Sequence, residues 1–205
     1  PTIGSEHKSE QQYRAEIADM KAHGVLYPSN YQGWDDVRLR RTLEIRRDLG
    51  MPTDVFYNLG QSTGSTADPA ALRTLQDRVK RWLDLCREFG YKDVYFYGID
   101  EAKGDRLASQ RLTWQAVQSA GGKTFVACYR KTFEAMGSLL DCAVPAGPPD
   151  AEEGAKWHSV GSQAFCYANP QVGVEEAETY RRNFGLVLWR SGFDGAMDYA
   201  YQHGF

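Results

Sequence analysis

Adjacent carboxylates are the residues of this sequence whose spacing best suits acid–base chemistry. The acidic pairs are Asp35-Asp36, Asp100-Glu101, Glu152-Glu153 and Glu175-Glu176. Three of them open expected helices, where acidic side chains stabilise the positive end of the helix dipole. Only Asp100-Glu101 directly follows an apolar run typical of a buried strand. Crowding and burial raise the pKa of one carboxyl of such a pair, which can then act as a general acid beside its charged neighbour. The alternative is that these two acids only cap the next helix.

Tyrosine, asparagine and carboxylate side chains gather where the apolar runs of the sequence end. Aromatic faces stack on the apolar faces of sugar rings, and tyrosine hydroxyls and asparagine amides bond sugar hydroxyls. We therefore predict a carbohydrate substrate, with Asp100 and Glu101 as the catalytic residues. The predicted substrate-binding residues are Tyr31, Trp34, Tyr57, Asn58, Tyr97, Tyr129, Tyr167, Trp189 and Asp198. Asn169, Tyr199 and Tyr201 are further polar residues at strand ends, and Trp189 also fits the end of a helix.

Neither the histidines nor the cysteines form a pattern that would bind a metal. The sequence has no His-x-His motif, no His/Cys cluster and no lysine at the end of an apolar run, which disfavours metal-dependent hydrolysis and Schiff-base chemistry. We predict no metal and no cofactor. The four cysteines are far apart and form no CxxC pair, so we expect buried, inert thiols. They are Cys86, Cys128, Cys142 and Cys166.

Short apolar runs alternate with segments of helical period along the whole chain, which is the pattern of βα units and a parallel sheet. The clearest helix begins with Asp68 as its N-cap and Pro69 in its first turn. The expected helices cover residues 9–23, 35–49, 69–89, 105–119, 133–140, 151–158 and 174–190. The expected strands cover residues 25–28, 53–58, 93–99, 124–129, 142–144, 163–167 and 195–199. Tyr95 and Tyr97 should share one face of their strand.

The 205 residues, of which 42% are hydrophobic, indicate one folded domain over residues 1–205. Seven units of about 30 residues predict a (β/α)8 barrel of the TIM type in which the first strand is missing or incomplete. A doubly wound open sheet is the competing fold, but it usually carries a glycine-rich phosphate turn. The only candidate, residues 60–64, lacks the GxGxxG and GxxxxGK[ST] forms.

The charge and the apolar runs exclude some partners. A net charge of −3 without a basic block gives no electrostatic footprint for nucleic acid. No apolar run approaches the roughly 18 residues of a membrane span. Because the chain opens on Pro1 rather than methionine, we expect a catalytic-type domain excised from a longer protein with other domains. The predicted location is secreted or periplasmic.

Two stretches resemble a family of glycoside hydrolases. The run from Val94 to Ala102 is similar to the fourth strand of hexosaminidase-type enzymes, which an Asp-Glu pair closes. The segment from Tyr167 to Gly195 resembles the end of glycoside hydrolase family 123 and its uncharacterised relatives. The sequence departs from the family pattern at Ala102, where relatives commonly have proline, and it lacks the accessory β-domain.

This resemblance implies a retaining hydrolysis of N-acetylhexosaminides in which the substrate's own acetamido oxygen attacks the anomeric carbon. Glu101 would then protonate the leaving oxygen and activate water, Asp100 would orient the acetamido group, and Tyr167 would bond its carbonyl. Two alternatives stay open. One is an ordinary retaining glycosidase with a separate nucleophile such as Asp198. The other is a carbohydrate-binding barrel without catalysis.

Overall fold

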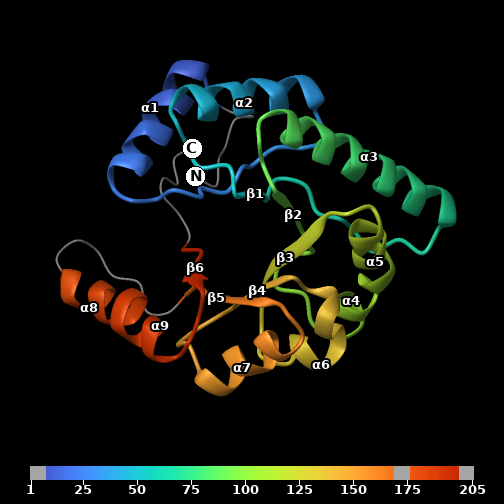
Figure 1. The fold of residues 1–205 in the computed structure, drawn as a ribbon. Coiled ribbons are helices and arrows are strands. Elements are labelled where there is room, and N and C mark those ends of the chain that lie inside the picture. Colours follow the sequence, from blue (N-terminus) through green and yellow to red (C-terminus); the bar gives the residue numbers. More distant parts are fainter. Residues whose placement is uncertain (1–7, 169–175, 199–205) are drawn as a thin grey trace.

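The computed structural model describes residues 8–168 and 176–198, in which helices and strands alternate (Figure 1). The strands are β1 (Val55–Asn58), β2 (Asp93–Tyr97), β3 (Lys123–Cys128), β4 (Cys142–Pro145), β5 (Gln163–Cys166) and β6 (Gly195–Ala196). The helices are α1 (Glu10–Ala22), α2 (Asp36–Asp48), α3 (Pro69–Glu88), α4 (Gly104–Ala108), α5 (Arg111–Ser119), α6 (Thr132–Met136), α7 (Ala151–Ser159), α8 (Ala177–Arg181) and α9 (Val187–Arg190), together with the 3-10 turn η1 (Gly137–Leu139) and the π-helix η3 (Arg182–Leu186).

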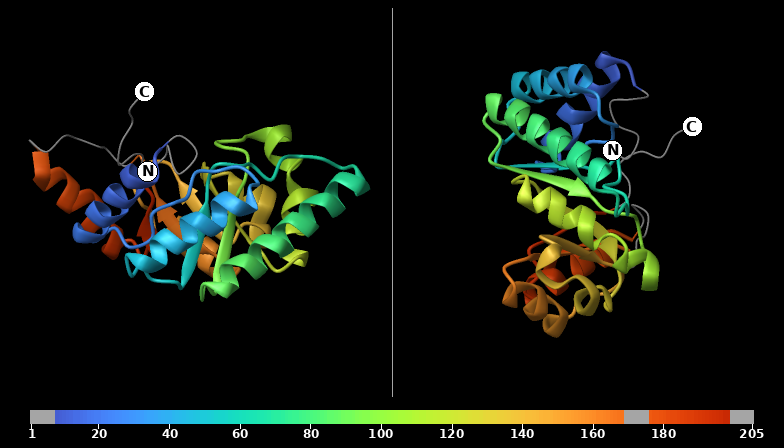
Figure 2. Two further views of the ribbon diagram at one scale, coloured as in Figure 1. Left: turned by 90° about the horizontal axis from the view of Figure 1, so that it is seen from above. Right: turned by 90° about the vertical axis from the view of Figure 1, so that its right-hand side faces the viewer.

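The six strands form one parallel sheet in the order β1-β2-β3-β4-β5-β6. The helices lie on the outside of this curved sheet, and their ring is open between α1 and α8 in the described part of the chain (Figures 1 and 2). Sequential parallel strands with helices on one side are the winding of a (β/α)8 barrel. The α/β class is therefore confirmed, and the described strands form a half-barrel rather than a closed ring of eight.

One predicted strand does not form. Residues 25–28 are irregular, and Val25, Leu26 and Tyr27 remain more than 40% exposed. The chain instead reaches the sheet at Asn30, which makes a single parallel bridge to Asn58 of β1. The prediction for residues 25–28 was wrong because apolar character alone does not provide a partner strand, and Pro28 offers no N–H for one.

The two faces of the sheet carry different cores. The inner face holds an aromatic cluster that includes Tyr57, Tyr95 and Phe125, whose rings pack edge to face or tilted. The outer face packs against the helices through residues such as Phe96 and Val126. Tyr95 and Tyr97 both belong to the inner cluster, as the alternation of side chains along a strand predicts.

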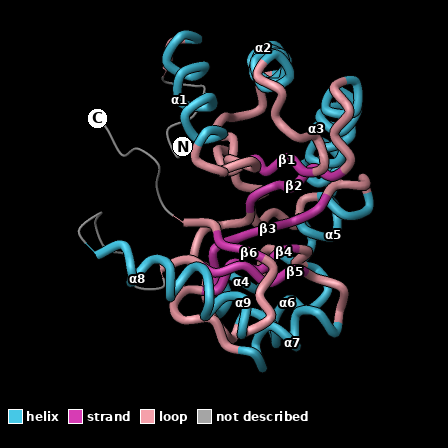
Figure 3. The backbone as a smooth tube through the Cα atoms, turned by 60° about the vertical axis from the view of Figure 1, so that its left-hand side comes forward, coloured by secondary structure: helices cyan, strands magenta, loops and turns pink. Residues whose placement is uncertain are grey.

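The helix starts follow from capping side chains. The Asp68 carboxylate accepts a hydrogen bond from the backbone N–H of Ala71, with Pro69 at the first helical position, so α3 begins where predicted. Asp150 caps α7 in the same way. Two predicted helices are divided, since residues 105–119 form α4 and α5 and residues 133–140 form α6 and η1. The described part of 174–190 is one continuous helix from α8 to α9 whose middle, η3, is π-helical (Figure 3).

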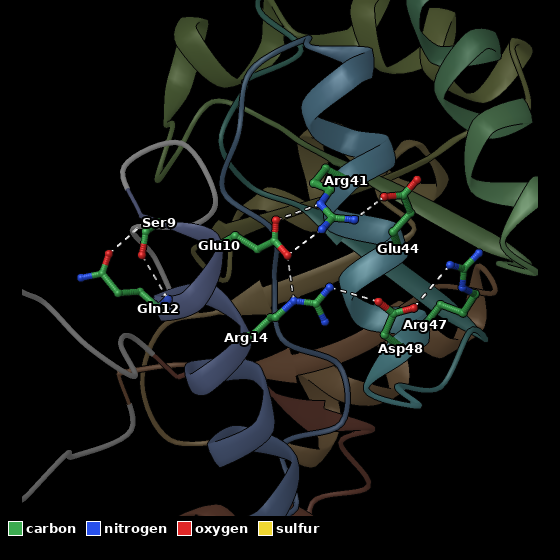
Figure 4. A network of polar contacts seen from close by, with 8 residues as sticks. All are labelled: Ser9, Glu10, Gln12, Arg14, Arg41, Glu44, Arg47 and Asp48. Atoms are coloured by element: carbon green, nitrogen blue, oxygen red, sulfur yellow. Dashed lines mark hydrogen bonds and ion pairs between the residues drawn. The ribbon is translucent and has the colours of Figure 1, made fainter.

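Ion pairs join α1 to α2 on the exposed side of the N-terminal helices (Figure 4). Arg41 of α2 donates to both carboxylate oxygens of Glu10, and Arg14 of α1 donates to Asp48 at 3.0 Å. The hydrogen bonds from these arginines lower the pKa values of Glu10 and Asp48. Because the pairs are solvent-exposed, they orient the two helices more than they stabilise them.

All four cysteines are buried and free of disulfides, as predicted. Burial raises the pKa of the Cys86 and Cys128 thiols to about 12 and that of Cys166 to about 11. Since the thiolate is the reactive form, these thiols are inert at neutral pH.

Candidate functional site at the end of strand β2

A fixed backbone turn follows β2 and carries the two predicted catalytic acids. The N–H of Gly98 donates to Phe125 and the N–H of Glu101 donates to Ala127, so β3 continues to support the chain beyond the end of β2. The N–H of Ile99 donates to the buried side-chain oxygen of Gln110 at 2.6 Å. Gln110 lies between α4 and α5, and this contact explains why the predicted helix is divided there.

Glu101 has a strained backbone. Its φ of 48° lies in the left-handed region, which a non-glycine residue seldom adopts. Such strain persists only where the surrounding structure imposes it, and it is concentrated at functional sites. Here the turn after β2 imposes it, and the consequence is a glutamate side chain turned toward the ends of the neighbouring strands.

Replacing this residue in two ways tests the strain. We expect Glu101→Gly to be more stable than Glu101→Ala by about 1 kcal/mol, because both lose the carboxylate but only glycine adopts a positive φ freely. Urea unfolding of the two variants measures the difference. At the helical residue Glu178 of α8 the same pair should differ in the opposite sense, since glycine is the poorer helix former. Equal stability of the two Glu101 variants would contradict a strained native backbone.

Two tyrosine hydroxyls hold the carboxylate of Glu101. Tyr129, which follows β3, donates to Oε2 at 2.8 Å, and Tyr167, which follows β5, donates to Oε1. The bond to Glu101 is the main cause of a raised pKa of Tyr129, so this hydroxyl keeps its proton at neutral pH. The ends of three strands thus meet at the Glu101 carboxylate. Each of its two oxygens accepts a hydrogen bond from a protonated tyrosine hydroxyl.

Asp100 belongs to a separate contact of the same turn. The Tyr97 hydroxyl donates to its Oδ1 at 2.6 Å and accepts from the N–H of Ala127 at 3.1 Å. Burial, and then the bond to Asp100, raises the pKa of Tyr97. The two acids therefore have different tyrosine partners. Tyr97 of β2 donates to Asp100, whereas the tyrosines that follow β3 and β5 donate to Glu101.

Lys103 completes the site, and the sequence pattern did not identify it. Its ammonium nitrogen lies 3.7 Å from the centroid of the Tyr129 ring, a cation–π contact. The search for lysines at strand ends missed it because it stands two residues beyond Glu101. Gln110 was missed as well, since its contact with Ile99 depends on the tertiary fold and leaves no local pattern.

A small hollow of about 130 Å³ lies between the segment after β3 and helix α7. Its charges are largely matched, because Arg130 pairs with Asp150 at 3.3 Å and Lys156 pairs with Glu152 at 3.6 Å. The residues lining it are Arg130, Lys131, Glu134, Asp150, Glu152, Glu153 and Lys156. Neither catalytic candidate lines this hollow, and both have exposed side chains.

Several predicted binding residues have structural contacts instead. Trp34 packs against Trp82 and Phe96 among the helices, so its ring faces are not free to stack on a sugar. Tyr57 is buried in the inner aromatic cluster. The buried amide of Asn58 donates to the carbonyl of Gln32 and ties the chain to β1.

Of the remaining predicted residues, three are described by the structure and three lie outside the described chain. Tyr31 is half-buried next to the bridge at Asn30, and Asp198 is exposed. Trp189 is 80% exposed on α9. Asn169, Tyr199 and Tyr201 are not among the described residues.

Within residues 8–168 and 176–198, no group of three or more His, Cys, Asp or Glu side chains is arranged to hold a metal ion. No helix of these residues is long and apolar enough to cross a membrane.

Comparison with known proteins gives no match by sequence but finds similar folds. No family model and no curated protein matches the chain. The apo form of 3-keto-D-glucoside 4-epimerase from E. coli superposes with a TM-score of 0.53 at 10% identity, over 99% of this chain and 93% of that one. A sugar phosphate isomerase/epimerase from Parabacteroides distasonis superposes with a TM-score of 0.52 at 8% identity, over 94% and 82%. The chain shares their fold.

These findings correct the family and the reaction inferred from the sequence. The resemblance to hexosaminidases and to glycoside hydrolase family 123 was wrong, since no family model matches and the similar structures are described as epimerases and isomerases. The predicted glycoside hydrolysis, by either mechanism, was therefore also wrong. The comparisons do not support the alternative of a barrel without catalysis. The motifs behind the resemblance are short, and a shared fold does not fix a reaction.

Proposed function

We propose that this chain is an isomerase or epimerase that transfers a proton at a carbon next to the carbonyl group of a sugar. One observation carries the proposal, namely the Glu101 carboxylate held by the hydroxyls of Tyr129 and Tyr167 at the carboxyl ends of the strands. Enzymes built on barrels of this winding have their active sites at that end. The two similar folds, both described as sugar-converting enzymes, give further support.

The chemistry needs a base for a carbon-bound proton and donors for the oxygen that gains charge. A carbonyl group acidifies the adjacent C–H, and Glu101 would remove that proton. In an isomerisation Glu101 would return it to the neighbouring carbon on the same face while the substrate hydroxyl proton passes to the former carbonyl oxygen. In an epimerisation a solvent proton would add to the opposite face, and Glu101 would release its own proton to solvent. The Tyr129 and Tyr167 hydroxyls would turn from the carboxylate to the substrate oxygen and stabilise the enediolate. Asp100, fixed by Tyr97, would orient a sugar hydroxyl.

Solvent isotope exchange tests this reaction without knowledge of the product. The protein is incubated in D₂O with a panel of aldoses and keto sugars, and proton NMR follows the C–H signal next to the carbonyl. We expect that signal to disappear for at least one sugar. The alditols formed by reducing the same sugars are the matched control and should not exchange. Absence of exchange across the panel would reject the proposal.

A further inference from the structure

We propose that Lys103 selects sugars that carry an anionic substituent, a phosphate or a carboxylate, at the Glu101 site. This inference rests on the proposed function and narrows its substrate class. The two similar structures do not decide the point, because one is named for a glucoside and the other for a sugar phosphate. The charges around Glu101 provide the argument.

The position of Lys103 relative to Glu101 is fixed on both sides. One phenol ring separates the two groups, since the ammonium lies over the Tyr129 ring and the carboxylate bonds that ring's hydroxyl. The backbone on either side is left-handed, with a φ of 48° at Glu101 and 53° at Gly104. Between them Ala102 is buried in the core. The lysine therefore projects from an anchored turn and not from a free loop.

Lys103 has no acidic partner among the described residues. Lys92, Lys123 and Lys156 each form an ion pair with a carboxylate. Lys80 of α3, like Lys103, forms none among the described residues, which makes it a matched control. The acids closest to Lys103 in the chain, Asp100 and Glu101, receive tyrosine hydroxyls instead. The Lys103 ammonium is thus held by a ring contact rather than by an ion pair, and it lies beside the candidate catalytic group.

An anionic substituent fits this charge better than the alternatives do. An exposed cation–π contact contributes about 0.5–1 kcal/mol, and a hydrogen bond to a charged group contributes about 1.5–3 kcal/mol. The ammonium can therefore turn to a phosphate or carboxylate while its aliphatic stem stays on the Tyr129 ring. The nearby hollow is a weaker anion site, because Asp150 and Glu152 already pair with Arg130 and Lys156 and its lining includes two further acids, Glu134 and Glu153, against Lys131.

The test compares charged and neutral forms of one sugar. Isotope exchange is measured with D-fructose 6-phosphate, D-fructuronate and D-fructose, using the native protein, Lys103→Met and Lys80→Met. Methionine keeps the stem without the charge, and Lys80 is an exposed lysine of α3 that serves as the control. We expect the native protein and Lys80→Met to favour one charged sugar by about 10-fold or more in kcat/KM, mainly through KM, as one charge-assisted bond predicts. In Lys103→Met the preference for the charged sugar over D-fructose should fall to about 1–3-fold. The sugar that is favoured distinguishes a phosphate from a carboxylate site.

A binding measurement keeps the inference separate from the proposed reaction. Inorganic phosphate and acetate are titrated into the native protein and Lys103→Met, and the NMR signals of the Tyr129 ring are followed. A shift in the native protein alone supports the anion site even if no sugar exchanges, in which case only the proposed reaction fails. Equal shifts in both proteins, no shift in either, or a charge preference that survives in Lys103→Met would overturn the inference.

Discussion

Replacing Glu101 by glutamine should lower the rate of carbon-bound proton exchange by about 10²–10⁴-fold, the usual contribution of a general base. Glutamine keeps the size of the side chain and one acceptor oxygen for Tyr129 or Tyr167, but it cannot take a proton at neutral pH. The loss should appear in kcat more than in KM, since the sugar hydroxyls keep their other partners. NMR exchange rates at saturating sugar measure it directly.

Glu178→Gln is the matched control for this substitution. Glu178 is exposed on α8 and pairs with Arg181 rather than with a tyrosine of the cluster. We expect it to leave the exchange rate unchanged and to alter stability by no more than about 0.5 kcal/mol. A Glu101→Gln variant that is folded and retains the full rate would remove Glu101 from the mechanism and leave the turn as a structural feature.

The capped helices and central strands of this chain are readable from local residues. Asp68 and Pro69 predict the start of α3, and the uninterrupted apolar run after Asp93 predicts β2. The run at residues 25–28 looks the same locally, but whether it becomes a strand depends on a neighbour, and only Asn30 reaches β1. Strand pairing is a long-range property, and local periodicity does not contain it.

The site was predictable to the extent that it lies at a strand end. Asp100 and Glu101 were predicted because an acidic pair directly follows a buried strand, and Tyr129 and Tyr167 because parallel strands end at one edge of a sheet. The structure brings Glu101, Tyr129 and Tyr167 into contact, and their role stays a prediction. Trp34 packs in the core instead of facing the strand ends. The position of a residue at a strand end does not determine whether its ring packs against the helices.

Tyr57 lies within β1 and is buried among the aromatic rings of the inner face, so its ring is not available to stack on a sugar. No local sequence pattern marks Lys103 or Gln110. Lys103 contacts Tyr129 and Gln110 bonds Ile99 only in the folded chain. The reaction was the least predictable feature, because an acid beside tyrosines is compatible with several proton transfers and a short motif does not choose among them.

Substitution of Gly98, which begins the turn after β2, is the second prediction with a large expected effect. A Cβ added at Gly98 would lie 2.7 Å from Cζ2 of Trp114 and 3.1 Å from the Gln110 oxygen that holds Ile99. Trp114 is fully buried, so it cannot move aside without disturbing the core. We expect Gly98→Ala to lower the free energy of unfolding by about 1–3 kcal/mol, the usual effect of overpacking. Exchange activity should fall by up to about 10²-fold, because a shift of about 1 Å displaces the reacting groups.

A second substitution shows whether this overlap is the cause. Trp114→Phe removes Cζ2, so adding Gly98→Ala to it should cost at least about 1 kcal/mol less than in the native background, a coupling of the size seen between residues in contact. Gly185→Ala is the control, since no atom lies within 4 Å of its added Cβ and alanine is the better helix former. Urea unfolding of the four proteins of the cycle gives the coupling. If the two losses simply add, Trp114 does not enforce the glycine, and the position of Glu101 depends on the bonds of the turn to β3 and Gln110 alone.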